Sequence, residues 1–344
     1  MNKIDTKNMF KSILDFPKNI EEALQITKEF NLKNKYNKIE NIVIAGMGGS
    51  AIGADIVSIL GKEDIEIPLT VSRGYKLPNW VNESSLVICS SYSGNTEETI
   101  SCLENAVERN AQICGITTGG ILKRKLNQLG KDIILIPSGL QPRAALGFSL
   151  IPISKFLEKL GILKVSFDFW LGIFLKNIKI YQDIYRRENL QNPTYQLAKN
   201  IYKKVPVIYA DSSTLSIVGT RIKGQISENS KMLIYQNDLP ELNHNEIVGW
   251  ENNPNILNHF VIIWLKDKTD HVRIKHRQNI SEGIFDEIGI KQFSIEGQGS
   301  SFQERFLNMI HFGDWLSYWC AILHKTDPSP VLKIDRLKKS LEVL

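Results

Sequence analysis

Two short segments of this 344-residue chain carry residue types that bind anions. The first, residues 46–53, reads Gly-Met-Gly-Gly-Ser-Ala-Ile-Gly and includes Gly49 and Ser50. Glycine lets a backbone turn sharply and approach a ligand closely. Where such a loop opens a helix, free N–H groups and the positive end of the helix dipole attract an anion. The segment therefore predicts a phosphate-binding turn, although it also fits a loose dinucleotide-binding fingerprint.

The second segment, residues 90–98, reads Ser-Ser-Tyr-Ser-Gly-Asn-Thr-Glu-Glu. A helix cap uses one hydroxyl, but this segment offers the hydroxyls of Ser91, Ser93 and Thr96 beside a glycine. Several hydroxyls next to exposed N–H groups make a neutral phosphate cradle. We therefore predict that these three side chains bind a phosphate group.

A nicotinamide-cofactor site is the competing interpretation of the first segment. Such a site usually has Asp or Glu at the end of the next strand. Here the expected strand at 67–71 runs into Ser72 and Arg73. Arg73 would suit the 2′-phosphate of NADP, but an NADP-dependent oxidoreductase would leave the hydroxyl-rich segment unexplained.

The elements that hold these segments form a regular alternation. Short apolar runs lie at 42–45, 67–71, 86–89, 113–116 and 133–136, with stretches of helical length between them. Short buried strands that alternate with helices are typical of a parallel, doubly wound α/β sheet. The first segment then follows the first strand, and the second follows the third.

The rest of the chain repeats this pattern more weakly. A largely helical stretch covers about 144–203, and strand-like runs return at 207–210, 232–235, 261–265 and 292–295. The tail, 331–344, has the apolar spacing of an amphipathic helix, which includes Leu344. We predict a first α/β domain over 1–150 with an N-terminal helical segment, a helical join over 151–203, and a second α/β domain over 204–344.

Composition excludes several classes of protein. The net charge is +5, and the basic residues are scattered rather than interleaved with aromatics, which argues against a nucleic-acid partner. No apolar run approaches the ~20 residues of a membrane span. The N-terminus lacks the apolar core of a signal peptide. The cysteines show no metal-ligand spacing and lie in predicted strands or helices, so buried reduced thiols and a cytoplasmic location are expected: Cys89, Cys102, Cys114 and Cys320.

Segment 91–99 resembles the phosphate loop of the sugar isomerase (SIS) domain, and segment 46–50 resembles its partner loop. Residues 142–145 (Pro-Arg-Ala-Ala) and 241–246 (Glu-Leu-Asn-His-Asn-Glu) extend the likeness. Together they resemble the bifunctional phosphoglucose/phosphomannose isomerase family, from about residue 40 to 340. The resemblance implies two SIS domains, a homodimer without metal or cofactor, and interconversion of glucose 6-phosphate and mannose 6-phosphate with fructose 6-phosphate.

Aldose–ketose isomerisation needs ring opening, a base that moves a proton between C2 and C1, and stabilisation of the enediolate. Glu228, late in a predicted helix, matches the family's proton acceptor. Without the resemblance, a solvated glutamate at a helix end would be the simpler interpretation. Arg143, in a loop after the fifth strand, resembles the family's substrate-binding arginine and would steady the enediolate.

The resemblance assigns ring opening to His244, which follows Glu228 by 16 residues in an Asn-rich loop. Similar isomerases supply this histidine from the neighbouring subunit. Glu241 and Glu246 flank it and are alternative acids. On sequence alone, a histidine of a surface loop explains the pattern equally well.

The last proton-transfer group is expected near the end of the chain. His324 is the candidate by resemblance, and Lys325 is its rival because related isomerases use a lysine there. Ser317 stands where the family has a threonine that is thought to give the substrate room to rotate about C2–C3, which would let one base serve both epimers. Plain helix packing is the alternative for Ser317.

A non-catalytic phosphosugar-binding regulator is the remaining alternative function. Such a protein would lack the base or carry a DNA-binding domain. The roughly 40 residues before the first strand are too few for a helix-turn-helix domain. The complete set of candidate groups therefore favours the isomerase.

Overall fold

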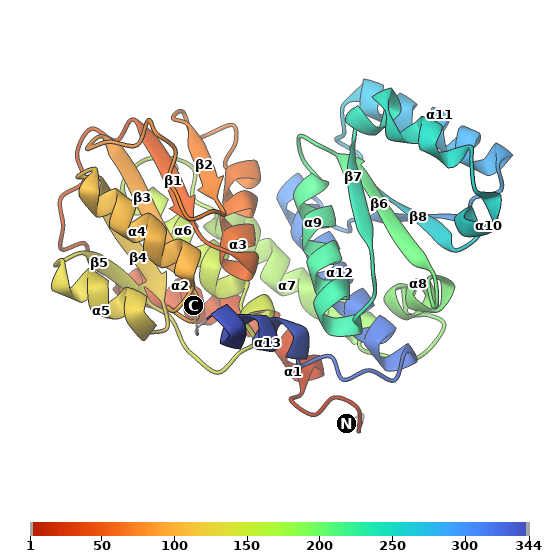
Figure 1. The fold of residues 1–344 in the computed structure, drawn as a ribbon, viewed down its shortest axis with the longest axis horizontal. Coiled ribbons are helices and arrows are strands. Elements are labelled where there is room, and N and C mark those ends of the chain that lie inside the picture. The colour runs from red at the N-terminus through yellow and green to blue at the C-terminus, as the bar shows by residue number, and fades with distance from the viewer. Residues whose placement is uncertain (1–2, 342–344) are drawn as a thin grey trace. The chain divides into compact units, whose positions relative to one another are not determined.

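The computed structural model describes residues 3–341 (Figure 1). These residues form two compact units. The first unit is Asp15–Phe169, and the second comprises 3–14 and 170–341. The predicted helical join, 151–203, is thus shared between the two units. Residues 1–2 and 342–344, which the predicted domain limits and the predicted tail helix include, lie outside the described residues.

The first unit is built on five parallel strands in the order β2-β1-β3-β4-β5. Each of the five apolar runs of the sequence overlaps one of them, with the runs at 67–71 and 133–136 extending beyond β2 and β5, and all seven residues of β3 are buried. Burial on both faces explains why these strands appear as continuous apolar runs rather than alternating ones. Their bounds are β1 (Asn41–Ala45), β2 (Leu69–Ser72), β3 (Ser85–Ser91), β4 (Gln112–Thr117) and β5 (Asp132–Leu135).

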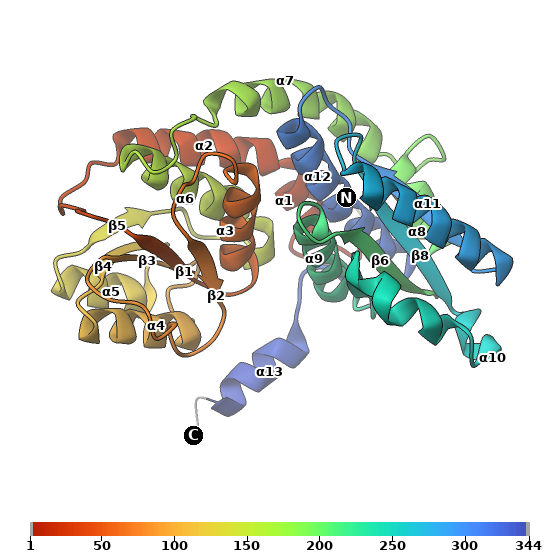
Figure 2. The same ribbon diagram turned by 90° about the horizontal axis from the view of Figure 1, so that it is seen from above.

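Helices cover both faces of this sheet. In Figure 2, α2, α3 and α6 lie on one side and α4 and α5 on the other, which confirms the doubly wound prediction. Pro17 does not break α2 but occupies its first turn, where a missing N–H costs nothing. The bounds are α2 (Phe16–Glu29), α3 (Gly48–Leu60), α4 (Glu97–Glu108), α5 (Gly120–Gln128), the 3₁₀ turn η1 (Pro142–Ala144) and α6 (Gly147–Lys159).

The second unit has four parallel strands in the order β7-β6-β8-β9. This order corresponds to β2-β1-β3-β4 of the first sheet, without a counterpart of β5. They are β6 (Val205–Asp211), β7 (Tyr235–Leu239), β8 (Phe260–Lys266) and β9 (Gln292–Glu296). The strand predicted at 232–235 is misplaced, since β7 begins only at Tyr235. β7 is an edge strand of mostly polar residues, whereas the apolar Leu233 before it is 69% exposed.

One long helix organises the second unit. α12 (Phe302–Leu323) is buried along almost its whole length and packs against α8, α9 and α1. The predicted tail helix is confirmed as α13 (Leu332–Leu341), none of whose residues is buried. The other elements are α1 (Met9–Leu14), α7 (Asp168–Tyr185), α8 (Pro193–Asn200), α9 (Ser216–Gln225), a π-helical turn (Ile226–Ser230), η3 (Glu241–His244), η4 (Glu246–Trp250), α10 (Pro254–Leu257) and α11 (Val272–Glu287).

The four cysteines are free and buried, as predicted. Burial raises the pKa of each thiol: Cys89, Cys102, Cys114 and Cys320. Across residues 3–341, every helix is too short or too polar to traverse a bilayer.

Candidate active site

The two anion-binding segments meet at one edge of the first sheet. β1 and β3 are neighbours, while their following helices lead to strands on opposite sides, so the strand order reverses between them. Open α/β sheets bind ligands outside the carboxyl ends of the strands at such a point. Residues 46–50 follow β1, and residues 91–96 follow β3. The predicted phosphate loops therefore lie where this fold places a ligand.

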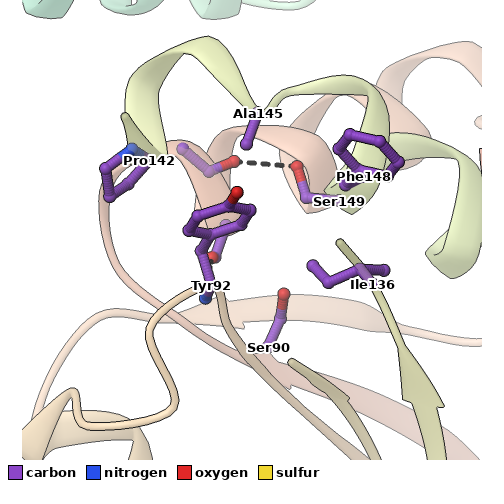
Figure 3. A pocket seen from close by; sticks show the side chains of 9 residues that line it. Ser90, Tyr92, Ile136, Pro142, Ala145, Phe148 and Ser149 are labelled. Atoms are coloured by element: carbon purple, nitrogen blue, oxygen red, sulfur yellow. Dashed lines mark hydrogen bonds between the residues drawn. The ribbon is translucent and has the colours of Figure 1, made fainter. Parts of the chain in front are cut away.

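Hydrogen bonds join these loops to each other and to the segment after β5. The Tyr92 N–H donates to Ser50 Oγ at 3.2 Å, and the Leu140 N–H donates to the Tyr92 hydroxyl at 3.0 Å. The Ser149 hydroxyl donates to the Gly49 carbonyl at 2.9 Å. Figure 3 shows Tyr92 and Ser149 around a small hollow, with Pro142 at its rim. The loops thus form one connected structure.

The packing of α3 against η1 leaves no room for a side chain at Gly49. A Cβ at this position would lie 2.6 Å from the Pro142 carbonyl oxygen, which is a prohibitive contact. The glycine therefore lets α3 lie directly against η1. This brings Arg143, which is 4% exposed, beside the first loop. The sequence predicted a substrate contact for both residues, and the structure places them together.

Three hydroxyls of the second loop have different surroundings. Ser91 is 2% exposed, and its Oγ lies 2.8 Å from Thr96 Oγ1 and accepts the Gly94 N–H at 3.1 Å. Ser93 is exposed, and its Oγ accepts the Asn95 N–H at 3.2 Å. Gly94 has φ +71°, which a side chain would strain. Ser91 and Thr96 are thus bonded to each other, while Ser93 is the most accessible of the three; their predicted contact with a phosphate group stays a prediction.

The N-terminus of α4 keeps its anion-binding capacity. Thr96 stands at the N-cap, but within the described residues its hydroxyl pairs with Ser91 and makes no capping bond. The N–H groups of the first turn are therefore directed outward with the positive end of the helix dipole. Glu97 and Glu98 in that turn oppose a bound anion, although Glu97 accepts the Tyr75 hydroxyl at 3.3 Å.

The residue that would suit NADP is already engaged. The Arg73 guanidinium forms an ion pair with Asp55 of α3. Its charge is thus largely neutralised within the first unit. The geometry gives no support to the oxidoreductase alternative.

In the second unit, Glu228 lies on the π-helical turn that follows α9. Single π-helical turns cost helix hydrogen-bond geometry and are frequent at functional sites. Glu228 is half-buried, whereas Asn229 is fully buried and Ser230 is 2% exposed. Glu228 and exposed Ser227 therefore lie on the outer side of a turn whose other residues, Ile226, Asn229 and Ser230, are buried.

Ser317 holds this turn against α12. Its Oγ accepts the Asn229 Nδ2–H at 2.9 Å and donates to the Asp314 carbonyl at 2.7 Å. Ser230 Oγ donates to the Ser317 carbonyl at 2.7 Å. Ser317 has no exposed surface. The resemblance placed Ser317 where the substrate needs room to rotate, which stays a prediction, and the structure adds that its hydroxyl is bonded to Asn229.

A buried ion pair next to this turn was not predicted from the sequence. Arg221 Nε and Nη2 donate to the two Asp314 carboxylate oxygens, each at 3.2 Å, and Gln225 Nε2 donates to Oδ1 at 2.6 Å. Burial raises the pKa of Asp314, and the Arg221 charge opposes that rise. The four-residue spacing of Arg221 and Gln225 places them on one helix face. Their partner, however, lies 89 to 93 positions away in the chain.

His324 caps the end of α12 with its ring nitrogen. Nδ1 lies 2.8 Å from the Cys320 carbonyl, and a carbonyl only accepts, so Nδ1 carries the proton. In this tautomer Nε2 carries no hydrogen and is the ring's hydrogen-bond acceptor. The rival residue, Lys325, is exposed and has φ +54°. Lys231, next to the π-helical turn, donates to the Asp327 carbonyl at 2.7 Å, so the turn and the end of α12 are connected.

His244 lies on the other face of the second sheet. α9 covers the face of Ile208 and Gln236, which surround Gly219. The Glu246 carboxylate instead accepts from Tyr209 at 2.5 Å and Asn237 at 2.6 Å. Successive residues of a strand point to opposite faces. The segment with exposed His244 therefore packs on the face opposite to α9.

One chain thus does not bring His244 to Glu228, because the second sheet separates them. The flanking acids are also occupied. The Glu246 carboxylate accepts hydrogen bonds from Tyr209 of β6 and Asn237 of β7. Glu241 Oε1 accepts the Asn245 side-chain amide at 2.8 Å. Neither is a better candidate than His244 for ring opening.

The second sheet carries a buried acidic edge. Asp211 ends β6, and Asp267 and Asp270 follow β8, at the carboxyl ends that correspond to the phosphate loops of the first sheet. Arg305 pairs with Asp267 at 2.6 Å. Burial raises the pKa of Asp270 to about 6, and the charges of Asp267 and Asp211 add to the rise. Residues 3–341 include no set of three or more histidine, cysteine or carboxylate groups arranged to hold a metal ion.

Comparison with known proteins agrees with this geometry. Residues 190–341 match the family described as bacterial phospho-glucose isomerase C-terminal SIS domain. A bifunctional phosphoglucose/phosphomannose isomerase of Caldicellulosiruptor bescii is 40% identical over 97% of this chain and 98% of its own. The protein of the same name from Aquifex aeolicus is 38% identical over 94% of this chain and 99% of its own.

Solved structures show the same fold at low sequence identity. The C-terminal domain of glucosamine-fructose-6-phosphate aminotransferase from Francisella tularensis has a TM-score of 0.71 at 16% identity, and covers 93% of this chain and 97% of its own. Tagatose-6-phosphate ketose/aldose isomerase from Escherichia coli has a TM-score of 0.65 at 12% identity, and covers 94% and 95%. With the full-length relatives, these findings place the chain in the bifunctional phosphoglucose/phosphomannose isomerase family.

Proposed function

We propose that this protein interconverts glucose 6-phosphate and mannose 6-phosphate with fructose 6-phosphate, through an enediolate and without a metal ion. The observation that carries the proposal is the half-buried Glu228, which lies on a turn whose next two residues, Asn229 and Ser230, are hydrogen-bonded to Ser317 of α12. A protein that only senses phosphosugars has no use for a base held in this way. The hydroxyl cradle of the first unit is the proposed phosphate-binding segment.

Each candidate residue has a chemical task in this proposal. Ser93, Thr96 and the first-turn N–H groups of α4 bind the phosphate dianion, and Ser50 completes the cradle. Glu228 moves the proton between C2 and C1. Arg143 offers a positive charge to the enediolate oxygen. His324 Nε2 makes the last proton transfer, with exposed Lys325 as the alternative.

A homodimer completes this set of residues. His244 is exposed and lies across the second sheet from Glu228, so it is suited to act on a substrate held by another copy of the chain. We therefore propose that ring opening uses His244 of the partner subunit. The four buried thiols are consistent with a cytoplasmic enzyme. There it would serve glycolysis or gluconeogenesis.

The decisive experiment measures fructose 6-phosphate formation by the purified protein, separately from each aldose phosphate and with EDTA present. We expect turnover of both, unaffected by EDTA. Turnover of glucose 6-phosphate alone would remove the dual specificity. Binding of both sugars without turnover would replace the proposal with the phosphosugar-binding regulator.

A further inference from the structure

The hydrogen bond from Asn229 to Ser317 has no solvent contact at either end. Both residues are 0% exposed, and Nδ2 and Oγ are 2.9 Å apart. Asn229 directly follows Glu228. We propose that this bond is a positioning device for Glu228, and that Ser317 acts on catalysis through Asn229 rather than by touching the sugar. The inference rests on the proposed function, in which Glu228 is the base.

A π-helical turn needs an external anchor. It inserts a residue into the helix and weakens the local hydrogen-bond ladder, so its own backbone bonds do not fix it well. Here both residues after Glu228 are tied to the same residue of α12, Asn229 to the Ser317 side chain and Ser230 to the Ser317 carbonyl. Two bonds to one residue restrict the rotation of the turn, and with it the direction of the Glu228 carboxylate.

The anchor is itself rigid. Gly313 lets α12 approach α9 closely, since a Cβ there would lie 2.3 Å from Ile222 Cγ1. At this crossing, Arg221 and Gln225 hold the Asp314 carboxylate. The Ser317 hydroxyl donates to the Asp314 carbonyl at 2.7 Å. Hydrogen bonds therefore run without a break from α9 through Asp314 and Ser317 to Asn229.

The test removes one hydroxyl and leaves the fold of the helix intact. Ser317→Ala deletes the acceptor of Asn229 and the bond to the carbonyl three residues earlier. Ser154→Ala is a matched control in α6. Ser154 is also 0% exposed, and its hydroxyl also donates to the carbonyl three residues earlier, at 3.0 Å from Ile151 O. Only the bond to the catalytic turn differs between the two substitutions.

We expect Ser317→Ala to lower kcat about tenfold or more, because small misplacements of a catalytic group are costly. The factor should be the same for glucose 6-phosphate and mannose 6-phosphate, with KM nearly unchanged. Ser154→Ala should keep the wild-type kcat. Ser317→Thr, which keeps the hydroxyl, should recover most of the activity.

Three results would overturn the inference. The first is an unchanged kcat in Ser317→Ala, and the second is an equal loss of kcat in Ser154→Ala. The third is a loss of kcat that differs between glucose 6-phosphate and mannose 6-phosphate and is accompanied by a higher KM, which would mean that Ser317 contacts the sugar. If Ser317→Ala does not fold, Ser317→Cys keeps the volume with a far weaker acceptor and is judged by the same criteria. Failure of the proposed function would be seen separately, as an inactive wild type or an active Glu228→Gln.

Discussion

The two sheets share a strand order but differ at the edge where this fold binds ligands. At the carboxyl ends of β1 and β3, the first sheet presents hydroxyls and N–H groups. At the matching ends of β6 and β8, the second sheet presents the buried carboxylates of Asp211, Asp267 and Asp270. We therefore expect a phosphate dianion to favour the first edge over the second, where Asp211 and Asp270 add carboxylates beyond the Asp267–Arg305 ion pair.

This difference shows that a repeated fold does not repeat a site. In the second unit, the groups assigned to catalysis lie on helices rather than at strand ends: Glu228 after α9, and His324 at the end of α12. Function therefore has to be argued from the side chains at each position and not from the architecture. The predictions below test whether phosphate binding belongs to the first unit alone and proton transfer to the second.

The largest effect is expected at Glu228. Glu228→Gln keeps the shape of the side chain but removes the base, so kcat should fall about 1,000-fold, within the range of general-base contributions. Binding of fructose 6-phosphate, measured by calorimetry, should persist. Glu287→Gln, at an exposed position of the same unit, should behave as wild type. A Glu228→Gln enzyme with near-normal turnover would remove proton transfer from this turn.

The second effect is expected at the phosphate loop. Ser93→Ala removes an exposed hydroxyl from the cradle and should raise KM about tenfold, as expected for a lost hydrogen bond to a charged group. Ser213→Ala makes the same change at the acidic edge, where the hydroxyl donates to Asp211 at 2.9 Å. Its KM should not change. Steady-state kinetics that showed equal rises in KM for both variants would contradict the division between the sheets.

The smallest effect concerns the acidic edge and is a change in stability. The Asp270 pKa, about 6 in the folded protein, is raised from an ordinary 3.8, so the folded state binds the proton more tightly. The free energy of unfolding should therefore fall as the pH rises from about 4 to 6. Asp270→Asn escapes this loss and should be about 1 kcal/mol more stable than wild type at pH 7.5, but not at pH 4.

Thermal melts across this pH range check the last prediction. A gain of about 1 kcal/mol corresponds to roughly 2–4 °C in Tm for a unit of this size. Asp286→Asn, at an exposed position of α11, is the control and should show no such difference. A constant offset between Asp270→Asn and wild type at all pH values would mean that Asp270 is not protonated on folding.

Much of the fold could be predicted because burial leaves a clear mark on the sequence. β1 and β3 are continuous apolar runs, since helices cover both of their faces. The failure at β7 has a physical cause. This edge strand pairs only with β6, and its register of backbone hydrogen bonds, with Asn237 opposite Tyr209, does not require apolar side chains. Hydrophobicity therefore pointed to exposed Leu233 instead.

Residue spacing could indicate candidate site residues only where they are close in sequence. Ser91, Ser93 and Thr96 lie in one loop, and their spacing alone indicated a phosphate cradle. The bond from Asn229 to Ser317 joins residues 88 positions apart and depends on a π-helical turn. A turn with one extra residue has no composition of its own, and the crossing of α9 and α12 that completes it is set by tertiary packing.

The buried cysteines allow local or global unfolding of each unit to be followed separately by thiol alkylation. Cys89, Cys102 and Cys114 belong to the first unit and Cys320 to the second, and burial keeps all four in the unreactive thiol form. An alkylating reagent can reach them only when the surrounding unit unfolds locally or completely. The rate at which each cysteine-containing peptide gains mass would therefore time the opening of the two units separately, in the unmodified wild-type enzyme.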